Sequence, residues 1–341
     1  MAALPFGLDI GRSFIKVVQV KRHGGKKLLT SVFSAATPSG GMVTDSPIEL
    51  KKISESVKSA VSQAKVEGRQ CIVSLIESQT VTRLVQMPNL TDKELAAAIN
   101  YEADKYIPLP IKEVNLQYKV VVRYPTGMEA GGKMDVLLVA APKRVVEKYL
   151  IVVHDCGLKL AAIETESSAT ARALASGVEA AVVIVSFGSA STEVVAVRQG
   201  SVIFTRSIPT GGDALTRAVM AEFNLQHSQA EQYKHSYGIL ENQLGGKVAS
   251  VLKPVLEVII AEIIRAVDFS KTHMLEAQLA RIIIAGGGAY LPGLSEFVTR
   301  RTSLEVSLAD PWEEFVKEGL ILKFPGQGGF YTTATGLAVR G

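Results

Sequence analysis

The chain repeats one pattern of strands and turns in its two halves. Residues 8–20 read LDIGRSFIKVVQV and residues 185–197 read VSFGSASTEVVAV, and a shift of 177 residues superimposes the two stretches. The shift aligns Gly11 with Gly188, and each stretch is followed by a basic turn and another apolar run, KRHGGKKLLTSVF or RQGSVIFTRSI. We therefore expect a strand, a Gly/Ser turn, a strand, a hairpin and a third strand in both halves.

The duplicated turns indicate a polyphosphate clamp, because free backbone N–H groups in such turns bind anionic oxygens. Asp9 ends the first strand, where its carboxylate can hold Mg²⁺ through water, and Lys16 on the next strand would point back as a charge for a phosphate. An ordinary hairpin with an exposed lysine is the simpler interpretation of the first turn alone, and the second turn at residues 186–190 argues against it. The shift places Ser186 where the first turn has Asp9.

Two further glycine sites fit the same chemistry. Gly211 and Gly212 precede a predicted helix, and Gly286, Gly287 and Gly288 follow a predicted strand in RIIIAGGGAYLPGL. Glycine lets the backbone approach a ligand, and a helix N-terminus favours anions.

Glu231 and Lys234 stand one helical turn apart, a spacing that suits hydrogen bonds to a ribose or an adenine. The alternative is structural: Ser228 and Glu231 would form a capping box, and Lys234 would be a solvated lysine.

Composition excludes several classes of protein. The 341 residues suffice for two domains, and 37 Lys and Arg against 33 Asp and Glu are too balanced to imply nucleic-acid binding. No apolar run reaches the roughly 18–20 residues that span a bilayer, and we recognise no signal peptide. Cys71 and Cys156 lack metal-ligand or redox spacing, and the five histidines suggest no metal site. We expect a cytoplasmic protein.

Strand and helix patterns alternate, which predicts an α/β protein with two related lobes. A helix with Leu95, Ile99 and Tyr106 on its buried face should open at a Thr91–Glu94 capping box, with Leu90 and Leu95 as a hydrophobic staple. The other predicted elements are a three-strand meander at 4–33, a helix at 51–67, strands at 71–76, 114–123 and 134–140, helices at 143–155 and 246–274, and a last helix from Thr332 or Thr333.

The order of these parts resembles the actin-like ATPase superfamily. LDIGRSFIK is similar to its first phosphate motif, VSFGSASTE to its second, and RIIIAGGGAYLPGL to its adenosine motif. ETESSATARAL (164–174) and TTATGLAV (332–339) resemble the two helices that connect the lobes, and GGDALT…AEQYK (211–234) resembles the FtsA-type stretch that contacts phosphate and adenosine. Residues 87–121 and the ending YTTATGLAVRG look most like the PilM family of type IV pilus assembly proteins.

This resemblance implies an actin-like ATPase fold of two RNase H-like lobes with a small α+β insertion of the 1C type. Residues 1–86 would form the first lobe, completed by 161–178 and 320–341, and 87–160 would be the partner-binding insertion. The second lobe would span 179–319, with a 2B-type part at about 211–275 and the adenosine-motif segment at 281–300.

The resemblance also implies ATP and Mg²⁺ between the lobes. The residues carried over for the phosphates and Mg²⁺ are Asp9, Gly11, Arg12, Ser13 and Lys16 on one side and Ser186, Gly188, Ser189 and Ala190 on the other, with Gly211 and Gly212 nearby. Those for the nucleoside are Glu231, Lys234, Gly286, Gly287 and Gly288. Glu166 matches the acid that orients a water in relatives, or it is a helix N-terminal carboxylate.

Ser186 departs from the pattern of the actin-like superfamily, which usually has Asp there. Electrostatic placement of metal and nucleophile supplies most of phosphoryl-transfer catalysis, so we expect ATP binding with weak or absent hydrolysis. The family resemblance further implies a partner, the cytoplasmic N-terminal tail of a PilN-like inner-membrane protein, in a groove beside the insertion. Other assembly-platform proteins and motor ATPases are further candidates, whereas nucleic acid and direct membrane insertion are not expected.

The chain would then lie in the cytoplasm, peripheral to the inner membrane through its partner. Two alternatives stay open: an active ATPase or small-molecule kinase on the same fold, and a filament former like FtsA. Fold alone does not separate them.

Overall fold

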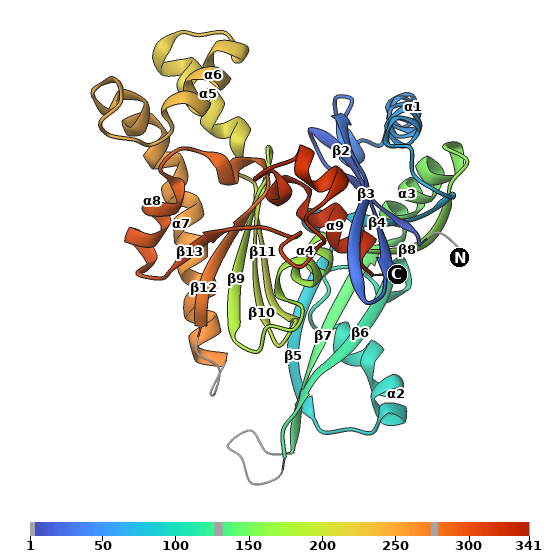
Figure 1. The fold of residues 1–341 in the computed structure, drawn as a ribbon. Coiled ribbons are helices and arrows are strands. Elements are labelled where there is room, and N and C mark those ends of the chain that lie inside the picture. The colour runs from blue at the N-terminus through green and yellow to red at the C-terminus, as the bar shows by residue number, and fades with distance from the viewer. Residues whose placement is uncertain (1–3, 126–131, 274–278, 341) are drawn as a thin grey trace.

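Two five-stranded sheets with the same plan form the body of the molecule. The computed structural model describes residues 4–125, 132–273 and 279–340 (Figure 1). The strand orders are β3-β2-β1-β4-β8 in the first sheet and β11-β10-β9-β12-β13 in the second. In each sheet the first three strands of the chain pair antiparallel and the other two add in parallel. The duplication and the α/β class predicted from the sequence are confirmed.

The strand bounds follow the predicted pattern closely. In the first sheet they are β1 Phe6–Ile10, β2 Phe14–His23, β3 Lys26–Ala36, β4 Gln70–Leu75 and β8 Lys159–Thr165. In the second sheet they are β9 Ala181–Phe187, β10 Thr192–Arg198, β11 Ser201–Ile208, β12 Leu279–Ala285 and β13 Val306–Leu308.

Both faces of the first sheet are covered, which explains why β1 is apolar throughout except for Asp9. On one face, Leu8 and Ile10 pack with α1 (Pro47–Ala64) and α3 (Lys143–Asp155). On the other face, Val18 and Val20 pack against α9 (Thr332–Ala338). Helix α1 begins four residues before its predicted start, because Ser46 caps its N-terminus and a proline occupies the first helical position.

The second sheet is covered in the same way. Its β9 residues Val183 and Val185 share a hydrophobic cluster with α5, α7 and α8, and their neighbours Val182 and Ile184 pack with α4 on the opposite face. The helix bounds are α4 Glu166–Ala175, α5 Gly212–Phe223, α6 His227–Tyr237, α7 Lys247–His273 and α8 Leu294–Thr302. Across the described ranges, no helix is both long and apolar enough to cross a membrane.

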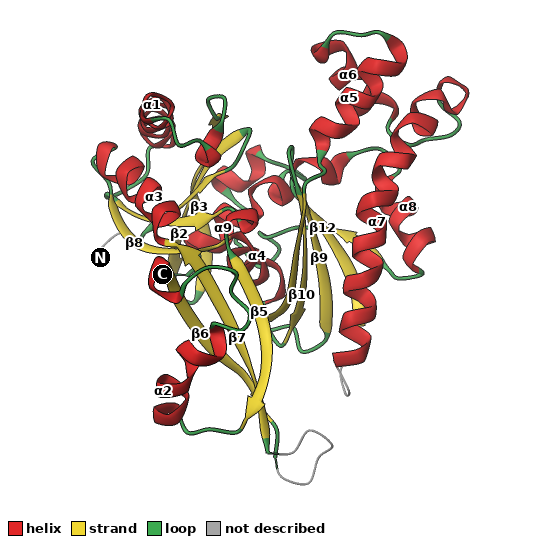
Figure 2. Ribbon diagram, turned by 180° about the vertical axis from the view of Figure 1, so that it is seen from behind, coloured by secondary structure: helices red, strands yellow, loops and turns green. Residues whose placement is uncertain are grey.

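A third, antiparallel sheet lies beneath the two lobes, with the order β5-β7-β6 (Figure 2). Its strands are β5 Val81–Pro88, β6 Val114–Arg123 and β7 Lys133–Pro142, and α2 (Asp92–Ala103) covers one face. The other face places Leu84 and Leu137 against the second lobe. The division of the chain into domains stays a prediction. In the structure the third sheet begins at Val81, before residue 87, and α3 packs on the first sheet.

Helix α2 confirms one prediction and corrects another. Thr91 and Glu94 form the predicted capping box, and Leu90 and Leu95 belong to the same hydrophobic cluster. The prediction that Tyr106 lies on the buried face is wrong. Because the helix ends at Ala103, its 3.6-residue period does not continue, and Ile107 enters the core while Tyr106 is 42% exposed.

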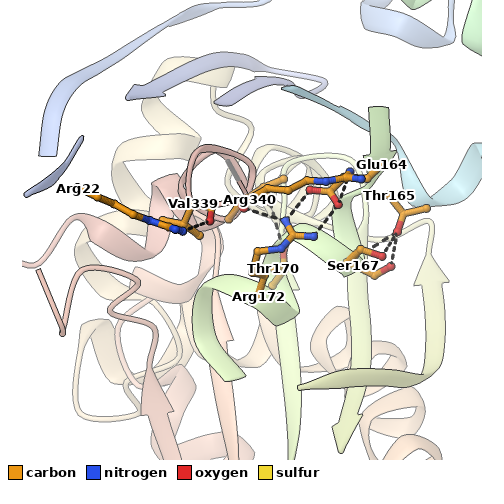
Figure 3. Close-up of polar contacts among 11 residues, drawn as sticks. Arg22, Glu164, Thr165, Ser167, Thr170, Arg172, Val339 and Arg340 are labelled. Atoms are coloured by element: carbon orange, nitrogen blue, oxygen red, sulfur yellow. Dashed lines mark hydrogen bonds and ion pairs between the residues drawn. The ribbon is translucent and has the colours of Figure 1, made fainter. Parts of the chain in front are cut away.

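Two helices, α4 and α9, lie between the lobes and cross closely (Figures 1 and 3). A Cβ atom at Gly336 would stand 1.9 Å from the carbonyl oxygen of Ala169, so only glycine permits this approach. Arg172 donates to both carboxylate oxygens of Glu164, at 2.6 and 2.7 Å, and to the carbonyl of Gly336 at 2.8 Å. Figure 3 shows Arg340 reaching the same carboxylate, at 2.9 Å. The two connecting helices are thus fixed to each other.

Candidate functional site

A cleft of about 1110 Å³ lies between the lobes. Strand ends and helix N-termini surround it, an arrangement that concentrates free N–H groups and polar side chains at one place. All seventeen residues named as site candidates from the sequence lie in or beside it: sixteen line the cleft, and Gly211 stands behind its wall.

The two duplicated turns have the same internal hydrogen bond. In the first turn, residues 11–14, the N–H of Gly11 donates to the carbonyl of Phe14 at 3.0 Å. In the second turn, residues 188–191, Gly188 donates to Ser191 at 3.0 Å. The turns also touch across the cleft, because the hydroxyl of Ser13 donates to that of Ser189 at 2.7 Å. The predicted pair of facing turns is therefore present.

Asp9 and Lys16 are cross-strand partners beside the first turn. The Lys16 ammonium lies 3.1 Å from Asp9 Oδ2, and Ser74 donates to Asp9 Oδ1 at 3.1 Å. Asp9 is 2% exposed, so its charge is kept in the protein interior by these two partners. Lys16 also lies over the ring of Phe330, 4.6 Å from the centroid. Both residues line the cleft.

The second lobe has a different pair in the same register. Ser186 is the cross-strand partner of Glu193, which is 6% exposed and accepts a hydrogen bond from Ser207 at 2.8 Å. Among the described residues, Glu193 Oε2 has no hydrogen-bond partner. Burial raises the pKa of Glu193 to about 8, and the charge of Glu77 adds to the rise. Sequence reasoning missed Glu193, although the 177-residue shift aligns it with Lys16.

Glu166, the first residue of α4, lines the cleft, and a second carboxylate that sequence reasoning did not find, that of Glu77, is buried next to it. Desolvation raises the pKa of Glu166 well above the usual glutamate value, and the charges of Asp9 and Glu193 raise it further. The backbone N–H of Glu77 donates to Glu166 Oε2 at 3.1 Å. Glu77 has no sequence signal of its own, because it joins the site only through the packing of distant segments.

Gly211 and Gly212 support the second turn from behind. The N–H of Gly212 donates to the carbonyl of Gly188 at 2.9 Å, and that of Asp213 to Ser189 at 2.8 Å. A Cβ atom at Gly211 would stand 2.6 Å from each of these two carbonyl oxygens. The N-terminus of α5 is therefore docked on the turn, and glycine at 211 is required for the approach.

Glu231 and Lys234 belong to a polar network on α5 and α6. Lys234 is 7% exposed and donates to Glu231 at 2.6 Å, to Thr216 at 2.8 Å and to the carbonyl of Gly212 at 3.3 Å. Thr216 donates to Glu231 as well. Burial opposes ionisation of Glu231, but the hydrogen bond from Lys234 leaves its pKa below the usual value.

The predicted Ser228–Glu231 capping box is wrong. Gln226 and Gln229 form the box at the start of α6, with Gln226 as the N-cap. The helix therefore begins earlier than the prediction required, and Glu231 lies in its second turn, where it faces the cleft instead of the helix end.

The glycine loop after β12 forms part of the wall of the cleft. Gly286 has a φ of 84°, and its N–H donates to the carbonyl of Gly329 at 2.9 Å. A Cβ atom at Gly288 would stand 2.5 Å from the ring of Phe187, and Phe330 approaches Gly287 from the other side. Backbone lies at the surface of this wall, so a flat group can approach it closely.

Comparisons with known proteins agree with this arrangement. The family model described as "Type IV pilus assembly protein PilM" matches residues 7–341. The chain belongs to the PilM family. A chain of a solved PilM–PilN type IV pilus biogenesis complex is 25% identical to this PilM-family protein, with a TM-score of 0.82 over 98% of both chains.

More distant relatives extend the likeness. The cell division protein FtsA of Streptococcus pneumoniae is 22% identical over 346 residues, which cover 89% of this chain and 75% of FtsA. MreB5 of Spiroplasma citri, solved bound to AMPPNP, is 12% identical with a TM-score of 0.55 over 97% of this chain and 94% of its own. This PilM-family protein therefore has the actin-like ATPase fold, with two α/β lobes of mixed sheets.

Proposed function

We propose that this protein is an ATP-binding adaptor of a type IV pilus assembly platform, in which Mg-ATP binds between the lobes and a membrane-protein tail binds at the third sheet. One observation carries the nucleotide half of the proposal: two turns of identical hydrogen bonding meet across the cleft at Ser13 and Ser189. Groups that donate from both sides suit a polyphosphate, which carries oxygens on every face.

The residues present fit the nucleotide. Gly11, Arg12, Ser13 and Lys16 would contact phosphates from the first lobe, and Gly188, Ser189 and Ala190 from the second. Lys234 and Glu231 would bind the ribose, and the wall at residues 286–288 would lie against the base. The solved MreB5 structure with AMPPNP supports this use of the fold in a relative.

Asp9 fits a magnesium ion held mainly by phosphates and water. Within the described residues, no group of three or more His, Cys, Asp or Glu side chains stands close enough to hold a metal ion. Mg²⁺ commonly uses one or two carboxylates together with substrate phosphates, so a lone aspartate beside a phosphate turn is sufficient. When bound, the ion would neutralise phosphate charge, while Lys16 would turn from Asp9 toward the phosphates.

We propose that hydrolysis is slow. Ser186 brings a hydroxyl where relatives have a carboxylate, and its cross-strand neighbour Glu193, with a pKa of about 8, is largely protonated at neutral pH. The second turn therefore offers little negative charge to organise a metal-bound water. Glu166, which lines the cleft, would be left to orient that water.

The partner half of the proposal rests on the PilM–PilN complex, whose PilM-type chain covers 98% of this one. We propose that the cytoplasmic N-terminal tail of a PilN-like protein binds beside the third sheet and holds this chain at the inner membrane from the cytoplasmic side. Exposed aromatic side chains at Tyr101 and Tyr118 give this region apolar surface for a peptide.

Calorimetric titration tests the proposal. The purified protein is titrated with Mg-ATP and with a synthetic peptide of the PilN-like tail, and ATP turnover is followed separately by phosphate release. We expect both ligands to bind and turnover to stay slow. Failure to bind the peptide, together with rapid turnover or phosphorylation of a small metabolite, would instead establish the enzyme alternative.

A further inference from the structure

Glu77 is a buried carboxylate with no part in the nucleotide contacts proposed above. It is 4% exposed and lies in the short segment between β4 and β5, where the chain passes from the first sheet to the third. Burial raises its pKa, and hydrogen bonds from Ser167 and Thr82 oppose the rise. A carboxyl group at such a site is destabilising unless it is hydrogen-bonded, so its partners show what it holds together.

Two of its contacts reach the cleft side. The N–H of Ser167 donates to Glu77 Oε2 at 3.4 Å, and the N–H of Glu77 donates to Glu166 Oε2 at 3.1 Å. Both partners lie in the first turn of α4, the helix that lies between the lobes. Glu77 therefore fixes where α4 begins and where the Glu166 carboxylate lies.

A further contact reaches the third sheet. Thr82, on β5, is 6% exposed and donates to Glu77 Oε1 at 3.1 Å. Side chains alternate along a strand, so Thr82 shares a face with Leu84, which packs on the second lobe, and not with Val85, which packs with α2. The side chain of Glu77 thus connects the first turn of α4 to the third sheet, which packs against the second lobe.

We propose that Glu77 is a positioning residue that couples nucleotide binding in the cleft to peptide binding at the third sheet. This inference rests on the proposed function. Any shift of α4 or Glu166 that accompanies nucleotide binding must carry Glu77 with it, and Thr82 passes the shift to β5. Because coupling is reciprocal, peptide binding at the sheet must change nucleotide affinity by the same factor.

Two variants test the coupling. In Glu77→Gln the side chain keeps its size but has one acceptor oxygen instead of two, so it can no longer accept from Ser167 with one oxygen and from Thr82 with the other. Thr82→Val keeps its shape and loses the hydroxyl. The matched control is Asp135→Asn, a change at a buried carboxylate of the same sheet whose partners, Gln86 and Tyr124, lie away from the cleft. The measurement is the Kd of the PilN-like tail peptide with and without Mg-ATP, and the ratio is the coupling factor.

We expect a factor of about 5 or more in the wild type, a typical size for linked sites. It should fall toward one in Glu77→Gln and Thr82→Val, and stay at the wild-type value in Asp135→Asn. The Kd of Mg-ATP, measured with and without peptide, should give the same factor. If Glu77 had a purely structural role, a folded variant would keep the wild-type factor.

The outcomes separate this inference from the function on which it rests. A wild-type protein that binds neither ligand overturns both. A wild-type protein that binds both ligands with a factor of one overturns the coupling alone, as does an undiminished factor in folded Glu77→Gln. If Glu77→Gln does not fold, Thr82→Val decides the matter by the same ratio.

Discussion

The first and second turns have the same internal hydrogen bond, but different residues support each turn. Thr37 supports the first turn, because its hydroxyl donates to the carbonyl of Gly11 at 2.8 Å and its N–H to Ser13 at 2.9 Å. The N-terminus of α5 supports the second turn through two backbone N–H groups. The positive end of a helix therefore lies behind one turn and the end of a strand behind the other.

The cross-strand pairs beside the turns differ as well. The first lobe places Asp9 beside Lys16, whereas the second places Ser186 beside Glu193 in the same register. The oppositely charged pair thus lies in the first lobe, while the second lobe has backbone donors and a helix end beside its turn. The two turns have the same hydrogen-bond geometry, and the chemical difference between the lobes lies in these two cross-strand pairs.

Lys16→Ala should have the largest effect on this comparison. A hydrogen bond to a charged group contributes about 1.5–3 kcal/mol, so the Kd of Mg-ATP should rise about 10- to 150-fold. The control, Lys26→Ala, removes an exposed lysine at the far end of the same hairpin and should leave the Kd unchanged. Calorimetric titration measures both. Equal affinities for the two variants would show that the first lobe does not supply the phosphate charge.

Gly211→Ala should damage the second turn alone. The new methyl group would stand 2.6 Å from two turn carbonyls, and overpacking of this kind costs about 1–3 kcal/mol of unfolding free energy. Gly212→Ala is the matched control, because its methyl group would be 3.6 Å from the nearest atom, an ordinary contact. Denaturant unfolding compares the two. A stable Gly211→Ala protein would mean that the turn does not depend on the docked helix.

Local signals explain what the sequence predicted, and long-range contacts explain what it missed. The duplicated turns, the Thr91–Glu94 box and the glycine sites are set by neighbouring residues, so a short stretch suffices to predict them. Glu193 was within reach, because the same shift that aligns the turns aligns it with Lys16. Glu77 was not, because Glu166 and Ser167 stand 89 and 90 residues away in the sequence and meet it only after two separate segments pack together.

Two misassigned residues show the limit of periodicity. Tyr106 fits the apolar face of a helix only if that helix continues past Ala103, and Glu231 fits a cap only if α6 begins at Ser228. In both places more than one side-chain pattern is compatible with a helix end. The helix end in the structure is not the one that the sequence prediction assumed.

Ser186→Asp should make the second lobe more like the first. A carboxylate beside the second turn would help to place the metal and the attacking water, and we expect phosphate release to accelerate about tenfold, or about 1.4 kcal/mol in barrier. The isosteric control is Ser186→Asn, which brings no charge. If the two variants turn over ATP equally slowly, the missing aspartate does not limit hydrolysis.

Glu193→Gln should have the smallest effect, visible as a change in pH dependence. Burial raises the pKa of Glu193 from 4.5 to about 8 in the folded protein, so the folded state binds more protons than the unfolded state between these values. Stability therefore falls as pH rises through that window. Glutamine removes this term, so from pH 6 to 7 the wild type should lose about 1 kcal/mol of unfolding free energy relative to Glu193→Gln. Glu77 and Glu166 face the same region and interact with the charge of Glu193, so the difference between the two denaturation series reports Glu193 together with its coupling to these two carboxyl groups. Parallel series across this range would show that Glu193 is ionised in the folded state, and the second lobe would then carry a negative charge after all.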